Sequence, residues 1–249
     1  MRFVLYNIRY GTGTGWRFHW PVPFSGYLRR TQENVEGIAA FLDSLEPDII
    51  GLVEVDNGSY RSKRVNQAEL IAKQLDFKHV YESKYREESL AQRVPVLKEQ
   101  GNAFLTNQNI EATDFHYFEH GFKRLVIELE FGEFVIFLVH LSLKYRHRQY
   151  QLEQLHSIFE SVGKPVIVAG DFNVFWGDRE LSLFLAASNL VNANQLGLPT
   201  FPSHAPRHQF DFVLHSPSIE ITGFHIAPVR FSDHMPLVVD FEVHNGHGK

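Results

Sequence analysis

The 249-residue chain contains no cysteine. Disulfide frameworks, thiolate nucleophiles and zinc sites built on cysteine are therefore excluded. No apolar run approaches the ~20 residues of a membrane span, and the N-terminus begins directly with a strand-like run that leaves no room for a signal peptide. We therefore expect a cytoplasmic protein. Positive charge is also scarce: 24 Lys and Arg against 29 Asp and Glu give a net charge of −5, which does not favour unspecific binding to nucleic acid.

Polar side chains follow a strongly apolar run at residues 165–169. The run predicts a strand buried on both faces. Asp171 and Asn173 come directly after it and would point to the same side if the strand geometry persisted. An acid and an amide at the end of a buried strand suit a site for a cation and a phosphate, although an Asx-rich turn would use the same residues. Asp178 is expected to cap a helix over 179–187.

Other strand-like runs also end in polar residues. Residues 2–9 carry Asn7 and Arg9, which the period of two places on one face, and residues 48–55 carry Glu54. An unpaired polar group in such a run is costly. The remaining residues of this kind are Asn102, His140, Asp211, Asp233 and His234.

Jointly, these residues supply three kinds of chemistry. Carboxylate and amide oxygens suit a hard cation such as Mg²⁺ or Mn²⁺, and imidazoles suit proton transfer or the stabilisation of an anion. An Asp close to an imidazole fixes its tautomer. A serine hydrolase using Ser232 or Ser142 is an alternative, but neither serine lies in a nucleophile-elbow motif. A non-catalytic binding module on the same fold is a second alternative.

Strands and helices alternate irregularly along the chain, and several strand pairs are joined by short turns. This order excludes a simple βαβ repeat and predicts one or two mixed sheets with helices outside. Because the sequence has no linker rich in Pro, Gly or Ser and no repeat, we expect one catalytic domain over residues 1–243, followed by a tail over 244–249. We expect a monomer.

A set of motifs then carries a resemblance. In chain order they are YNIR, LVEVD, GNAFLTN, LVHLS, GDFN, FDFVL and SDHMP, between residue 3 and about residue 243. Together they resemble the endonuclease/exonuclease/phosphatase superfamily, which contains deoxyribonuclease I. The resemblance implies an α+β fold, the four-layer α/β/β/α sandwich of two packed mixed sheets with outer helices. It also implies a metal-dependent hydrolase of phosphoesters that uses Mg²⁺ or Mn²⁺.

The resemblance assigns a role to each residue on the metal side of the site. It makes Glu54 the principal metal ligand, with Asn7 beside it and Asp233 as a further carboxylate. Asn102 matches a residue that contacts phosphate or supports a histidine. Arg9 stands where the branch that repairs abasic DNA has an acid, so that activity is disfavoured and Arg9 is expected to bind substrate.

The resemblance also implies how the remaining residues would act in catalysis. Asp171 matches the acid that orients or activates the attacking water, and Asn173 matches the amide that holds the phosphate. His234 matches the histidine that faces the scissile phosphate, and Asp211 the acid that supports it. His140 matches the second histidine of the deoxyribonuclease and phosphatase branches.

The substrate is open at this stage. A small or lipid-derived phosphodiester suits the aromatic segment 16–24, whereas an endonuclease acting on DNA or RNA needs a basic track. Nucleic acid is possible but is not favoured by the net charge. The candidate basic groups are Arg29-Arg30, Arg61-Lys63-Arg64, Lys123-Arg124 and Lys144-Arg146-Arg148.

Overall fold

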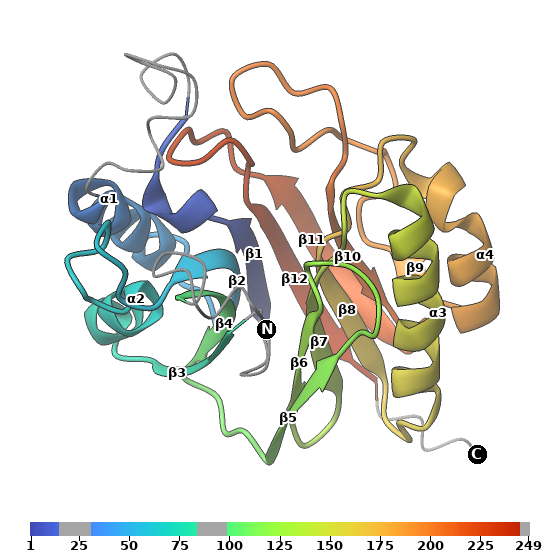
Figure 1. Cartoon of the computed structure of the whole chain (residues 1–249). Helices are drawn as coiled ribbons and strands as arrows, with labels where there is room; N and C mark the ends of the chain where they lie inside the picture. The colour runs from blue at the N-terminus through green and yellow to red at the C-terminus, as the bar shows by residue number, and fades with distance from the viewer. Residues whose placement is uncertain (15–30, 84–98, 245–249) are drawn as a thin grey trace.

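The computed structural model describes residues 1–14, 31–83 and 99–244. Within these ranges, two six-stranded β-sheets pack against each other with helices outside (Figure 1). The first sheet has the order β11-β12-β1-β2-β4-β3. Its strands are β1 (Arg2–Asn7), β2 (Ile49–Asp56), β3 (Lys78–Ser83), β4 (Gln100–Thr106), β11 (Ile219–Ile226) and β12 (Leu237–Val243).

The second sheet has the order β5-β6-β7-β8-β10-β9. Its strands are β5 (Ala112–Tyr117), β6 (Leu125–Glu130), β7 (Val135–His140), β8 (Val166–Asp171), β9 (Val191–Asn192) and β10 (Asp211–His215). The helices are α1 (Gln32–Asp43), α2 (Gln67–Leu75), α3 (Tyr145–Glu160), α4 (Asp178–Ser188) and the short 3₁₀ helix η1 (Arg9–Gly11). In the described ranges, no helix combines the length and the apolar character needed to span a bilayer.

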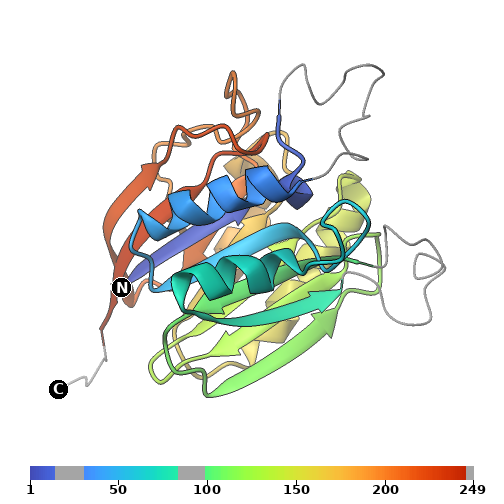
Figure 2. The ribbon, with the colours of Figure 1, turned by 90° about the vertical axis from the view of Figure 1, so that its left-hand side faces the viewer.

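The apolar core forms three layers, because strands of both sheets are buried on both faces. In β1, Phe3 and Leu5 point into the layer between the sheets, and Val4 and Tyr6 point into the layer under α1 and α2. Figure 2 shows these two helices side by side on the outer face of the first sheet. A third layer packs the second sheet against α3 and α4. The predicted four-layer α/β/β/α sandwich is therefore confirmed.

Both sheets contain parallel and antiparallel strand pairs, and this pairing places polar residues from several strands at one edge. In the first sheet β1 runs parallel to β2, so Asn7 lies at the edge where β2 also ends. In the second sheet β7 runs parallel to β8, and His140 lies opposite Asp171. Strand β10 runs antiparallel to β8 and begins at Asp211, again opposite Asp171. Four of the residues singled out from the sequence are thus at strand ends.

The structure corrects two local predictions. Strand β1 ends at Asn7, and Arg9 opens η1 with a φ of 47°, so the two residues do not share a strand face. Gly177, not Asp178, precedes the first residue of α4. The aromatic segment 16–24 and Arg29-Arg30 lie outside the described residues.

Arg61, a candidate for a basic track, is instead buried in a loop after β2. Its Nη2 donates to Asp56 Oδ2 at 2.8 Å, and both side chains are almost wholly buried. The Asp56 carboxylate also accepts the backbone N–H groups of Gly58 and Ser59. Arg61 therefore holds a turn together and is not available to a phosphate backbone.

Replacing Arg61 by methionine is expected to lower the free energy of unfolding by about 3–5 kcal/mol, because Asp56 would stay buried without its countercharge. Urea denaturation followed by circular dichroism measures the change. The control is Lys63→Met in the same loop, where the side chain is exposed and the expected change is within about 0.5 kcal/mol. Equal losses in the two variants would show that the buried pair has no special weight.

Candidate active site

The two sheets are joined at their shared edge by a hydrogen bond between side chains. Asn7, at the end of β1, donates from Nδ2 to Asp171 Oδ2 at 3.0 Å. Both side chains are buried. The remaining amide oxygen of Asn7 accepts the backbone N–H of Arg9 at 3.0 Å. Asn7 thus fixes the position of the Asp171 carboxylate from the opposite sheet.

Gly170 brings the ends of β7 and β8 together. Its φ is 153°, and a Cβ at this position would lie 1.9 Å from the carbonyl oxygen of Val139. Only glycine permits this approach. As a result, His140 Nε2 lies 3.3 Å from Asp171 Oδ2.

Asn173 reaches the site through a turn. Its φ is 51°, so the strand geometry has ended, and its backbone N–H donates to Asp171 Oδ1 at 3.0 Å. Its side-chain Nδ2 donates to the carbonyl of Leu141 at 2.9 Å. The alternation expected from the sequence does not persist, but an Asx turn brings the Asn173 backbone against the Asp171 carboxylate.

His234 and Asp211 form a buried pair. His234 Nδ1 lies 2.8 Å from Asp211 Oδ2, and Thr200 donates its hydroxyl to the same oxygen at 2.6 Å. His234 Nε2 lies 3.9 Å from Asp171 Oδ2. Burial lowers the pKa of a histidine, but the carboxylates of Asp211 and Asp171 outweigh it and raise the pKa of His234 to about 10. The imidazole is therefore held in its charged form.

The Asp171 carboxyl is held ionised by its surroundings. Burial on its own would raise its pKa, but His140, His234 and Lys123 hold the pKa of Asp171 well below its usual range. A carboxylate of such low pKa is a weak base, so it is better suited to orient a water molecule than to remove its proton.

Glu54 is aimed into the site by a β-bulge. The register between β2 and β4 shifts between Leu52 and Val55, and Glu54 has a φ of 59°. Bulges commonly redirect a side chain next to a functional site. Asn102, buried on β4, accepts the Glu54 backbone N–H at 3.3 Å and so supports the bulge. Glu54 Oε1 lies 3.9 Å from His140 Nε2.

Arg9 and Asp233 form an ion pair with 3.2 Å between Nε and Oδ2. Ser232 donates its hydroxyl to the other carboxylate oxygen at 3.3 Å. The structure therefore places Asp233, expected from the resemblance to be a metal-side carboxylate, against a guanidinium. Arg9 is correspondingly engaged by a carboxylate.

A family model settles the chain's relationships. The model of the endonuclease/exonuclease/phosphatase family matches residues 4–234. The chain belongs to this family. Members of the family are typically metal-dependent hydrolases of phosphoesters. A search of curated proteins found no match.

Solved structures share the fold at low sequence identity. The catalytic domain of human Nocturnin with a bound sulfate anion is 19% identical, covers 98% of this chain and 94% of its own, and has a TM-score of 0.71. A mannosyl-6-phosphatase from Bacteroides thetaiotaomicron is 16% identical over 97% and 99%, with a TM-score of 0.70. D. rerio TDP2 complexed with single-strand DNA product is 13% identical over 98% and 99%, with a TM-score of 0.69.

The family generally uses Mg²⁺, and Glu54 fits such an ion. In residues 1–14, 31–83 and 99–244, no three Asp, Glu or His side chains form a ready-made metal cluster. Mg²⁺ needs no such cluster, because it keeps several waters and is bound through one or two carboxylates and the phosphates of a substrate. Glu54 offers a carboxylate oxygen 3.9 Å from His140 Nε2, and the Asp171 carboxylate lies 3.3 Å from the same nitrogen.

Three residues at or next to the candidate active site were not identified from the sequence. Lys123 was noted only as part of a basic pair, yet its ammonium contacts His140 Nε2 and lies 3.9 Å from Glu54 Oε1. Thr200 lies in an irregular segment with no pattern to indicate its contact with Asp211. Gln151 could have been found, since it is polar and lies four residues before the inward Leu155 on α3. It accepts the Ser142 N–H and donates to the carbonyls of His120 and Lys123.

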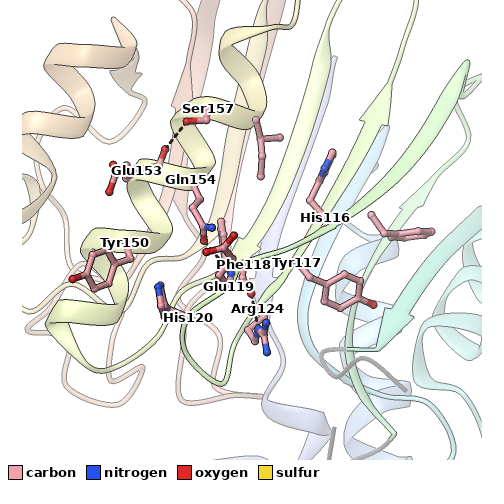
Figure 3. Close-up of a pocket in the computed structure, with 12 residues that line it drawn as sticks. His116, Tyr117, Phe118, Glu119, His120, Arg124, Tyr150, Glu153, Gln154 and Ser157 are labelled. Carbon is pink, nitrogen blue, oxygen red and sulfur yellow. Dashed lines mark hydrogen bonds between the residues drawn. The ribbon is translucent and has the colours of Figure 1, made fainter. Parts of the chain in front are cut away.

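A hollow of about 810 Å³ lies beside the site, between β5 and α3 (Figure 3). His116 lines it and lies 2.6 Å from Glu128. The rings of His120 and Tyr150, which also line it, are in contact at a tilt, with 4.9 Å between centroids. None of the site residues described above lines this hollow. The candidate active site is therefore the edge where the two sheets meet.

Proposed function

We propose that this chain is a metal-dependent phosphodiester hydrolase, that water attacks phosphorus in line with the leaving group, and that the substrate is a small or lipid-derived phosphodiester. One observation supports this most directly. Asn7, His140 and His234 all lie within hydrogen-bonding or ion-pair distance of Asp171, at the edge where the two sheets meet. Strand ends and loops from distant parts of the chain supply the groups that such a reaction needs.

Asp171 would orient the attacking water. Its two oxygens already accept from Asn7 Nδ2 and from the Asn173 backbone N–H, so the carboxylate cannot rotate freely. Its low pKa keeps it an acceptor at neutral pH. A fixed acceptor of this kind holds a nucleophile near its line of attack, which is a large part of catalysis by positioning.

The two histidines would stabilise the phosphoryl oxygens. His234 is charged, and because Asp211 engages Nδ1, its Nε2–H is directed toward Asp171 and the site. His140 enters from the neighbouring strand. Hydrogen bonds from positioned donors strengthen as negative charge develops on those oxygens. Mg²⁺ held by Glu54 would add charge neutralisation on the phosphate.

A nuclease is the second candidate, and the arrangement of basic residues supports it less well. Arg61 is buried against Asp56, and Arg148 is buried against Glu180. Neither residue can therefore contribute to the basic track that DNA or RNA would need. The acidic net charge points the same way.

A panel of phosphoesters assayed with Mg²⁺ and with Mn²⁺ tests the proposal. It contains bis-p-nitrophenyl phosphate, p-nitrophenyl phosphate, sphingomyelin, a phosphoinositide, plasmid DNA and RNA. We expect turnover of the diesters that exceeds turnover of the monoester, and little on DNA. His234→Ala protein purified in parallel separates this activity from a contaminant. No turnover of any diester, or turnover equal in the variant, would refute the proposal.

A further inference from the structure

Exposed apolar side chains gather around the candidate site on three loops and on the first residue of α3. Two of the loops directly follow the strands that end in His140 and Asp171, and the third precedes β6. The side chains are between 46 and 80% exposed. These residues, here called the apolar rim, are Phe122, Leu143, Tyr145, Phe175 and Trp176.

Arg148 contacts both the segment that follows β7 and the loop that follows β8. Its guanidinium lies 5.8 Å from the Tyr145 ring and 6.0 Å from the Phe175 ring. Arg148 also donates to the carbonyl of Leu143 and pairs with the buried carboxylate of Glu180. The rings of Tyr145 and Trp176 meet edge to face with 6.5 Å between centroids. The rim is thus a supported surface, not a set of separate side chains.

Ring contacts continue from the rim to the catalytic histidine. Phe175 meets Phe210 at 5.1 Å, Phe210 stacks on Phe201 at 4.8 Å, and Phe201 meets the His234 imidazole at 4.9 Å. A surface that rests on Phe175 and Trp176 therefore lies beside the site at which a phosphoester would react.

The third loop is held against the loop that follows β7 by Gln151. This buried side chain donates to the carbonyls of His120 and Lys123 on one side and accepts the backbone N–H of Ser142 on the other. Phe122 lies between the first two of these anchors and is 80% exposed. The anchored loop therefore carries an apolar side chain that is exposed to solvent.

Basic residues are interleaved with the rim. Lys144 and Arg146 are exposed and flank Tyr145 in the sequence. Apolar and aromatic side chains interleaved with Lys and Arg are typical of surfaces that lie in the headgroup region of a bilayer. Anionic headgroups would complement these two charges despite the overall net charge of −5.

We propose that the apolar rim binds the surface of an anionic lipid bilayer, with Phe122, Leu143 and Trp176 entering the boundary between headgroups and acyl chains. Single-stranded nucleic acid fits less well, because it needs exposed ring faces on which bases stack. Here Tyr145 and Trp176 meet at an interplanar angle of 71°, and Leu143 has no ring. That the bound lipid supplies the substrate rests on the function proposed above, whereas the binding itself does not.

Sedimentation of the full chain with vesicles tests the binding. We expect it to sediment with phosphatidylcholine vesicles that contain phosphatidylserine, and less with phosphatidylcholine alone. The variant Leu143→Ser/Trp176→Ser should need at least about a hundredfold more lipid for half-maximal binding, since each buried side chain contributes about tenfold or more. Lys144→Glu/Arg146→Glu should lose the preference for anionic vesicles.

The matched control is Leu183→Ser/Leu196→Ser, which removes two leucines that are 81 and 84% exposed and do not belong to the rim. Circular dichroism and melting temperature confirm that each variant is folded. Failure of the wild type to sediment, or equal weakening by the rim and control variants, would overturn the proposal. So would binding of the wild type to a single-stranded oligonucleotide in place of vesicles. If the wild type binds vesicles but hydrolyses no soluble diester, the proposed function fails and the rim proposal stands.

Discussion

Replacing His234 by alanine is expected to lower kcat on a chromogenic phosphodiester by about 10²–10⁴-fold, the range for loss of a positioned acid or anion-stabilising group. The reason is the charge on the imidazole, which Asp211 and Asp171 maintain in a buried site. Alanine leaves no donor for the phosphoryl oxygens, whose negative charge grows in the transition state. Steady-state kinetics with purified variants measures the loss.

Asp211 acts through His234 in this interpretation, so the two residues should not be additive. Asp211→Asn keeps the shape of the side chain and removes its charge. The double variant should lose little more activity than His234→Ala alone, because residues that act as a unit are strongly non-additive. His225→Ala on β11 controls for the loss of an exposed histidine elsewhere and should retain wild-type kinetics. Losses that multiply in the double variant would show that Asp211 and His234 work independently.

Regular elements were predicted well where the sequence pattern is local. The helix Gln67–Leu75, for example, buries Ala68, Ile71 and Ala72, which recur at helical spacing in the sequence. Amphipathic spacing and strand-like runs are set by neighbours in the chain, so they can be read without the fold. The same holds for the strand before Asp171, where β-branched residues indicate burial on both faces.

The geometry of the site depends on contacts between distant segments, which no local pattern contains. Asn7 and Asp171 are 164 residues apart, yet they are bonded directly. Glu54 points into the site because a register shift against β4 inserts a bulge. Alternation predicted that Arg9 lies on a strand face, but β1 ends at Asn7 and Arg9 is the first residue of η1. In each case a tertiary contact overrides the local period.

Charge is where the sequence misleads most. Four of the candidate basic residues look equivalent in the sequence, but they differ in burial and in their partners. Arg61 and Arg148 are each buried with a carboxylate, Lys123 enters the site, and Lys144 is exposed on the apolar rim. Only the fold shows which positive charges are already neutralised by a partner, so a count of Lys and Arg overestimates the basic surface available to nucleic acid.

Replacing Glu54 by glutamine is expected to raise the dissociation constant for Mn²⁺ by about tenfold or more, a loss at least as large as that seen when a residue supporting a metal ligand is removed. The charge of the carboxylate disappears while its size is kept. Catalysis should fall by about 10²–10³-fold at a fixed metal concentration, since a bound cation contributes several kcal/mol to the transition state. Electron paramagnetic resonance of free Mn²⁺ measures binding without any need for turnover.

Lys123 provides a test of opposite sign. Its ammonium lies 3.9 Å from Glu54 Oε1 and therefore competes with a metal ion for the same carboxylate. Lys123→Met should lower the dissociation constant for Mn²⁺, because removing a positive charge at that distance favours a second cation. Glu69→Gln, which changes an exposed glutamate on α2, has the same change in net charge as Glu54→Gln and should leave Mn²⁺ affinity unaltered. If Glu54→Gln binds Mn²⁺ as tightly as the wild type, Glu54 is not the metal ligand. If excess EDTA leaves turnover intact, the reaction does not need the cation.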